Sequence, residues 1–228
     1  MATAYRGFGY FGLFSIFGVV LFGFRHDPGA PWHNFLFGAV LYSAWAAVHL
    51  MMTSDWFKGA AYGDRAGSPI ERRVYILVTV TTWLAVLWYH PRLPGLAIGV
   101  PGALRFAATV GFLMAVFTFF EGLTFHAIDA LIAAPGTEMA YSHGAETKLL
   151  TEGRYAAVRH PMYQAVIQAG LCSLIIHANL AQLFWVLMIG GTFIGFIPIE
   201  EARLLAKRGD DYRAYMLQTP WRLVRRVW

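Results

Sequence analysis

Long apolar runs, separated by short polar and charged stretches, dominate the pattern of this chain. A helix crosses a bilayer core with about 20 mostly apolar residues, and backbone groups in lipid must be hydrogen-bonded within their own segment. The pattern therefore predicts six transmembrane helices. They cover roughly residues 7–24, 35–53, 74–90, 104–125, 162–179 and 181–198. Only HANLA separates the last two, so we expect these to form a tight antiparallel hairpin.

The composition agrees with an integral membrane protein. Hydrophobic residues make up 57% of the 228 residues and charged residues only 14%, and the mean hydropathy is +0.49. A soluble domain needs more charge to cover its surface. We therefore expect an all-α, polytopic transmembrane helical bundle that forms a single domain over residues 1–228. The single cysteine, Cys172, lies in an apolar run and is interpreted as a small buried hydrophobe, with no spacing typical of a metal site.

The distribution of charge predicts how the bundle is oriented. The formal net charge of +5 does not indicate a nucleic-acid partner, because the charges fall between apolar segments instead of forming a basic face. With both termini cytoplasmic, 15 of the 18 Lys and Arg residues lie inside, and only Arg25, Arg92 and Arg105 lie outside. Basic residues concentrate on the cytoplasmic side of membrane proteins, so we expect this orientation.

Two groups of polar residues should then lie on the same cytoplasmic side. The first is in GRYAAVRHPMYQAV, just before the fifth predicted helix; its members are Arg159, His160, Pro161 and Tyr163. The second follows the sixth helix and includes two carboxylates and two tyrosines: Glu200, Glu201, Tyr212 and Tyr215. Adjacent helical residues point about 100° apart, so only one carboxylate can turn into the bundle. The hairpin should join both groups into one composite cluster.

These residue types suit a zwitterionic, aromatic ligand. Arginine can bind a carboxylate with two hydrogen bonds, glutamate can hold an ammonium group or ribose hydroxyls, and tyrosine can stack on a base. A carboxylate or tyrosine face also tolerates a sulfonium. S-adenosylmethionine carries all of these groups. In the competing interpretation, Arg159 and His160 are anchors at the lipid headgroups, and the tyrosines belong to an interfacial aromatic belt.

The order of the motifs resembles a known family. R-H-P-x-Y, a helical hairpin, E-E, then G-x-x-Y-x-x-Y and a proline appear as GRYAAVRHPMY…PIEEARLLAKRGDDYRAYMLQTP, within a cofactor-site half at 150–220. This order resembles the membrane methyltransferase superfamily of isoprenylcysteine carboxyl methyltransferases and phospholipid N-methyltransferases. VHLMMTSDWFKG and SPIERRVYILVTVTTWLAVLWYHP look like bacterial methanethiol S-methyltransferases and their denitrification-associated relatives. Two positions depart from the pattern: Ala165 replaces a usual glycine and Arg154 a usual proline.

The resemblance implies methyl transfer from S-adenosylmethionine to a small thiol or a lipidic, lipid-soluble acceptor, with S-adenosylhomocysteine as product. It implies a bacterial inner (cytoplasmic) membrane protein whose cofactor site faces the cytoplasm. The implied cofactor shell is Tyr155, Arg159, His160, Pro161, Tyr163, Glu200, Glu201 and Tyr212. Arg159, the candidate for the methionine carboxylate, and Glu201 are the implied catalytic residues. Most of the rate should come from alignment and desolvation.

Two ionisable residues in apolar runs are candidate substrate residues. Glu121 lies in FTFFEGLTFH, and ionisable groups inside membrane segments are costly and often functional. Snorkelling to the headgroups, or pairing with His126, would explain Glu121 equally well. His49 could contact substrate, bind haem, or be a satisfied core histidine.

Two other functions stay open at this point. The denitrification-associated branch is also related to the zeta-carotene isomerases, so a haem-binding isomerase with His49 or His126 as axial ligand is the alternative enzyme. The other alternative is a degenerate, non-catalytic family member that serves as a subunit of a membrane complex, with Ala165 and Arg154 as signs of decay.

Overall fold

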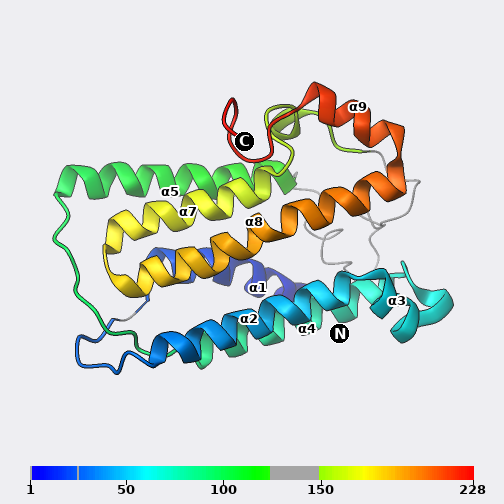
Figure 1. The fold of residues 1–228 in the computed structure, drawn as a ribbon. Coiled ribbons are helices and arrows are strands. Elements are labelled where there is room, and N and C mark those ends of the chain that lie inside the picture. The colour runs from blue at the N-terminus through cyan, green and yellow to red at the C-terminus, as the bar shows by residue number, and fades with distance from the viewer. Residues whose placement is uncertain (1, 25, 124–148) are drawn as a thin grey trace.

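Helices account for the regular structure in a computed structural model that describes residues 2–24, 26–123 and 149–228 (Figure 1). The α-helices are α1 (Ala2–Phe22), α2 (Asn34–Thr53), α3 (Asp55–Tyr62), α4 (Pro69–Trp88), α5 (Gly102–Leu123), α7 (Pro161–His177), α8 (Leu180–Arg208) and α9 (Asp210–Gln218), and the short 3-10 helices are η1 (Gly63–Arg65) and η3 (Gly153–Ala156). No β-strand occurs within these ranges. The all-α expectation is confirmed.

Four helices are long and apolar enough to cross a membrane. They are Ala4–Phe22, Asn34–Thr53, Gly102–Glu121 and Leu180–Arg208. The other two predicted segments coincide with α4 and α7, which do not meet this requirement. α4 carries three consecutive charged residues at 71–73 in its first turns, and α7 has only 17 residues. The chain therefore has the make-up of a membrane protein, and six membrane crossings remain a prediction.

Apolar side chains on the outside of the bundle agree with this make-up. Leu36 is 69% exposed, Phe106 72% and Leu187 63%, and they lie on three different helices of the bundle. An exposed apolar surface of this kind is unfavourable in water and marks contact with a protein or a membrane.

Two helix boundaries differ from those expected from hydropathy alone. α4 starts earlier, because Ser68 caps it by accepting a hydrogen bond from Glu71 N (3.4 Å) and Pro69 takes the first helical position. α8 continues beyond the last predicted transmembrane segment, through Pro198 to Arg208. An interior proline removes one backbone hydrogen bond, and helices packed against neighbours tolerate this in membranes.

The bundle has two layers (Figure 1). α4 packs against both α1 and α2 in one layer, and α5, α7 and α8 form the other. α2 meets α8 and α1 meets α7 where the layers join. Aromatic side chains from both layers fill the core between them: Phe17, Tyr42, Trp45, Trp83, Phe112, Phe119 and Trp185.

The expected hairpin between the last two long helices is present. α7 ends at His177, Ala178 adopts a left-handed backbone (φ 40°), and Asn179 caps α8 by accepting a hydrogen bond from Gln182 N (2.8 Å). Left-handed residues commonly close helix C-termini, and asparagine is a favoured N-cap. α8 therefore runs back along α7 and, because it is longer, continues past the level at which α7 begins (Figure 1).

Small residues let α5 and α7 pack more extensively than any other helix pair among the described residues. Ala115 and Ala165 have no exposed surface, and Gln168 Nε2 donates to the Gly111 carbonyl at 3.2 Å. An added Cβ on Gly111 would lie 3.0 Å from the sulfur of Cys172. Such small residues allow helix backbones to approach closely in membranes. Cys172, which the sequence predicts to be a buried hydrophobe, packs against the core here but is only partly buried.

Candidate functional site

A buried charge network joins the start of α7 to α8. Arg159 Nε donates to Glu201 Oε1 at 2.7 Å, and His160 Nε2 lies 3.2 Å from the same oxygen. Arg222 donates from Nε and Nη2 to Glu201 Oε2, each at 2.9 Å. The side chains of Arg159 and Glu201 are both 4% exposed. Because a buried carboxylate is costly without partners, these three donors are what allow Glu201 to remain inside the protein.

The chain after α9 closes this network from outside. The backbone N–H of Arg159 donates to Trp221 O at 2.8 Å, and that of His160 donates to Arg222 O at 3.0 Å. Arg159 Nη1 also donates to Thr219 O at 2.8 Å. Residues 219–222 are thereby fixed against the R-H-P-x-Y motif, and this attachment carries the Arg222 guanidinium to the carboxylate.

The two adjacent carboxylates of α8 face different surroundings, as their 100° separation predicts. Glu201 turns inward, whereas the Glu200 side chain is 44% exposed. Glu200 Oε2 lies 3.5 Å from His160 Nδ1, and Glu200 also hydrogen-bonds to the hydroxyl of Tyr163. The His160 ring stacks on Tyr163, with centroids 5.5 Å apart and planes inclined by 13°. His160 therefore bridges both carboxylates.

This position favours a protonated imidazole. Burial alone would lower the pKa of His160, but hydrogen bonds and attraction from Glu200 and Glu201 outweigh burial and raise its pKa above the usual value of 6.5. A charged His160 adds a second cationic partner for the carboxylates beside the guanidinium groups.

The tyrosines of α9 pack inside the protein. Tyr212 is 1% exposed and Tyr215 4%, and their ring centroids are 5.8 Å apart. The Tyr215 hydroxyl donates to the Tyr155 carbonyl at 2.8 Å, and burial raises the pKa of Tyr215 to about 12. These side chains are covered by protein, so they do not form an exposed aromatic belt; they fix α9 against η3.

The motif residues of the N-terminal half also meet. The Tyr75 hydroxyl lies 2.6 Å from His49 Nε2, and Thr79 Oγ1 lies 3.5 Å from His49 Nδ1. Lys58 Nζ and Glu71 Oε1 form an ion pair at 2.9 Å. His49 and Tyr75, which come from α2 and α4, thus form a second polar cluster within the bundle.

One face of α8 separates the two clusters. Phe193, Phe196 and Glu200 recur at helical spacing, so they share this face. Phe193 packs on the Tyr163 ring with centroids 4.8 Å apart, and Phe196 stacks on His49 at 5.7 Å with the planes inclined by 6°. Tyr75 is close enough to Glu200 for the two to interact electrostatically. The His49 cluster and the His160 cluster therefore both contact the same face of α8, at neighbouring aromatic side chains.

Three other residues singled out in the sequence have local packing or pairing roles. Glu121 pairs with Arg154 at 2.7 Å, and both side chains are 42% exposed; His126, its other expected partner, lies outside the described residues. Pro161 is fully buried as the first residue of α7. Ala165, which stands where the resemblance expects a glycine, is enclosed in the hydrophobic core that α7 shares with α5.

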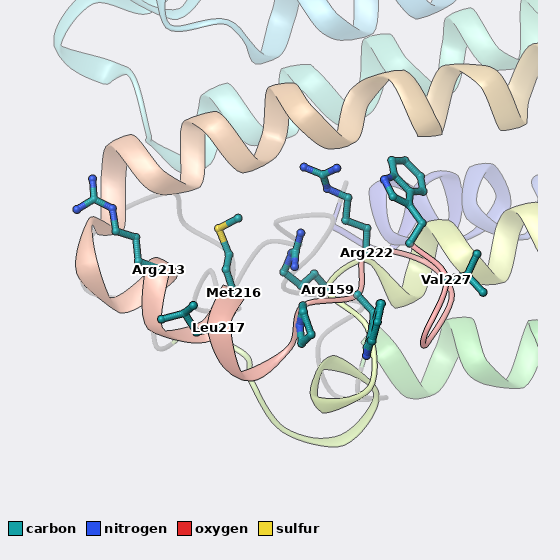
Figure 2. Close-up of a pocket in the computed structure, with 9 residues that line it drawn as sticks. Arg159, Arg213, Met216, Leu217, Arg222 and Val227 are labelled. Atoms are coloured by element: carbon teal, nitrogen blue, oxygen red, sulfur yellow. The ribbon is translucent and has the colours of Figure 1, made fainter.

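A pocket of about 700 Å³ borders the network, beside α9 and the following chain (Figure 2). Arg159 is the member of the predicted cofactor shell that lines it. Figure 2 shows its labelled side chains following the chain from Arg213 on α9, past Met216, to Arg222 and Val227.

Two residues of the site were not singled out from the sequence. Thr219 contributes a backbone carbonyl, which has no signature in the sequence. Arg222 was counted only among the cytoplasmic basic residues, and nothing in its spacing distinguishes it from the neighbouring arginines.

Comparison of the chain with protein-family models, with curated proteins and with solved structures finds no match. A functional proposal therefore depends on the chemistry of the chain's own residues.

Proposed function

We propose that this protein is an S-adenosylmethionine-dependent integral membrane methyltransferase that acts on a small thiol or a lipid-soluble acceptor. The observation that carries the proposal is the α8 face at Phe193, Phe196 and Glu200, which has a charged cluster on one side and the His49 cluster on the other. A group-transfer site needs two such neighbouring subsites, one for the donor and one for the acceptor. The concentration of basic residues supports a site facing the cytoplasm.

The residues of the charged cluster fit the parts of the cofactor. Glu200, which is half-exposed, can hold the ammonium group or the ribose hydroxyls, and Tyr163 offers an aromatic face. Arg222 donates to Glu201 from Nε and Nη2. Its Nη1 has no partner among the described contacts, so it can bind the carboxylate of the cofactor. When bound, the cofactor would supply an electrophilic methyl group on a sulfonium.

The structure changes the role that we propose for Glu201. Because Arg159 and Glu201 neutralise each other at 2.7 Å, Glu201 is better suited to hold two guanidinium groups in place than to bind a ligand itself. Arg159 then presents its remaining nitrogen to a carboxylate as a positioned donor. Both residues stay within the proposed site, with Glu201 as a positioning residue.

The His49 cluster fits the acceptor subsite. Phe196 covers the His49 ring, so the subsite is largely apolar and excludes water, which strengthens electrostatic interactions inside it. When the acceptor is a thiol, its proton must leave as the sulfur attacks the methyl carbon. His49 can accept that proton through the Tyr75 hydroxyl, which lies 2.6 Å from its Nε2 and takes up the thiol proton as it passes on its own.

One observation favours a second candidate, a non-catalytic subunit of a membrane complex. Arg159, His160 and Arg222 are all engaged by Glu201, so the same network can act purely as a link between α7, α8 and the C-terminal chain. For the haem-binding isomerase, the contacts of both His49 nitrogens with Tyr75 and Thr79 argue against axial ligation.

A methyl-transfer assay tests the proposal. Purified protein is incubated with S-adenosylmethionine labelled on its methyl group, together with thiols, prenylcysteines, phospholipids or quinone-like phenols. Transfer of label to one acceptor class, abolished in Glu200→Gln, is the expected result. If the protein transfers no label and does not bind S-adenosylhomocysteine, the proposal is wrong and the subunit role stands. A Soret band in purified protein would instead support the haem-binding alternative.

A further inference from the structure

The chain around the pocket in Figure 2 is strongly basic. Residues 212–228 contain four arginines and no aspartate or glutamate. Arg213 is 71% exposed and pairs only with Asp210, three residues earlier. Arg225 and Arg226 are exposed and have no acidic partner among the described residues. Arg225 and Arg226 therefore add net positive charge beside the pocket, which attracts an anion.

The same chain also exposes apolar side chains. Leu217 is 84% exposed, Val227 74% and Val224 49%, while Met216 contributes to the pocket lining. The Arg222 guanidinium lies over the Trp228 ring, 5.4 Å from its centroid. A mixture of arginine, tryptophan and aliphatic residues is typical of surfaces that lie at the boundary between membrane and water.

The position of this chain points to the same boundary. It follows α8 after the short helix α9, and α8 is one of the four helices that can cross a membrane. Juxtamembrane basic clusters are attracted to anionic lipids by about 1 kcal/mol per residue. A soluble phosphate would engage the arginines but leave the neighbouring apolar side chains unused.

We propose that this pocket binds the headgroup of an anionic phospholipid. The phosphate faces Arg213, with Arg225 and Arg226 adding attraction from nearby, while Arg222 stays paired with Glu201. The glycerol and first acyl carbons lie against Met216, Leu217 and Val227. Because residues 221–222 are hydrogen-bonded to the backbone of Arg159 and His160, the bound lipid stabilises the closed charge network. This proposal does not depend on the methyltransferase function.

Native mass spectrometry of the full chain, released from mixed detergent micelles, tests it. The micelles contain phosphatidylglycerol and phosphatidylcholine in equal amounts. The tail variant R213Q/R225Q/R226Q is compared with the control variant R65Q/R92Q/R105Q, which removes the same charge at three other exposed positions. The wild type and the control should retain phosphatidylglycerol preferentially. The tail variant should bind it at least about tenfold more weakly, given about fivefold per arginine before screening.

Four outcomes would overturn the proposal. Equal retention of the two lipids would show that charge does not select the ligand. An equal loss in the control would show that the effect is one of net charge alone. Binding of glycerol 3-phosphate as tight as that of the lipid would identify a soluble phosphate site. Displacement of phosphatidylglycerol by S-adenosylhomocysteine would identify the pocket as the cofactor site.

Discussion

Arg159 Nε lies 2.7 Å from Glu201 Oε1, across 42 residues of sequence, and both side chains are 4% exposed. Arg159 lies two residues before the start of α7 and Glu201 lies in the last third of α8, so this bond closes the hairpin at its open end. The network formed around it, with His160 and Arg222, is the structural basis of the proposed cofactor site.

Removing Glu201 should destabilise the protein much more than removing its neighbour. Glu201→Ala leaves the buried guanidinium of Arg159 without its carboxylate, which typically costs about 3–5 kcal/mol. Glu200→Ala removes a carboxylate that is 44% exposed, and we expect a loss of about 1 kcal/mol or less. Denaturant unfolding in detergent micelles measures both. If both variants lose the same free energy of unfolding, the burial of Glu201 does not make its ion pairs more stabilising.

The stability of the protein should depend on pH through His160. The pKa of this residue is raised in the folded state from 6.5, so protonated His160 stabilises the fold fully below about pH 6.5. That contribution is lost as the pH rises through the raised pKa. The wild type should therefore lose stability relative to His160→Gln when the pH is raised from about 6 to about 8.5. Thermal unfolding of both proteins at the two pH values measures the difference, and parallel pH profiles would contradict it.

The helical elements were largely predictable because their signals are local. Runs of apolar residues indicated where the long helices lie, and HANLA indicated the turn that Ala178 and Asn179 form. α8 continues past Pro198, as the helical geometry expected for Glu200 and Glu201 requires. Packing between helices tolerates the backbone hydrogen bond that the proline removes.

Loss of the ion pair between Glu121 and Arg154 should have little effect. Both side chains are 42% exposed, and exposed pairs contribute about 0–1 kcal/mol. Arg154→Ala should therefore change the free energy of unfolding by less than about 1 kcal/mol and leave the affinity for S-adenosylhomocysteine unchanged. Calorimetric titration and denaturant unfolding check the two parts. A large loss of affinity would place this pair in the cofactor site.

Restoring the glycine that the resemblance expects at Ala165 should not improve the site. Ala165 is enclosed in the core that α7 shares with α5, and glycine in a helix interior costs about 1 kcal/mol relative to alanine. Ala165→Gly should lower the free energy of unfolding by about that amount, with no gain in ligand affinity. An affinity that rises severalfold in the same titration would show that Ala165 does shape the site.

The composition of the candidate site was predictable in part. Arg159, His160 and Glu201 were expected to meet because the hairpin returns α8 to the start of α7, and they do. Their pairing with one another was not predictable, since a sequence does not show whether a buried arginine binds a ligand or a neighbouring carboxylate. Arg222 was missed because only the path of the chain after α9 brings it to Glu201.

Calorimetric titration of the purified protein with S-adenosylhomocysteine tests the central claim most directly. We predict saturable binding to the wild type and to Arg65→Ala, a control that removes an exposed guanidinium. Arg159→Ala should lose at least about thirtyfold in affinity, as expected for a charge-assisted hydrogen bond of about 2 kcal/mol. Glu200→Gln, which should fold normally, should also bind more weakly. No binding to the wild type, or equal affinity in all four proteins, would contradict the account.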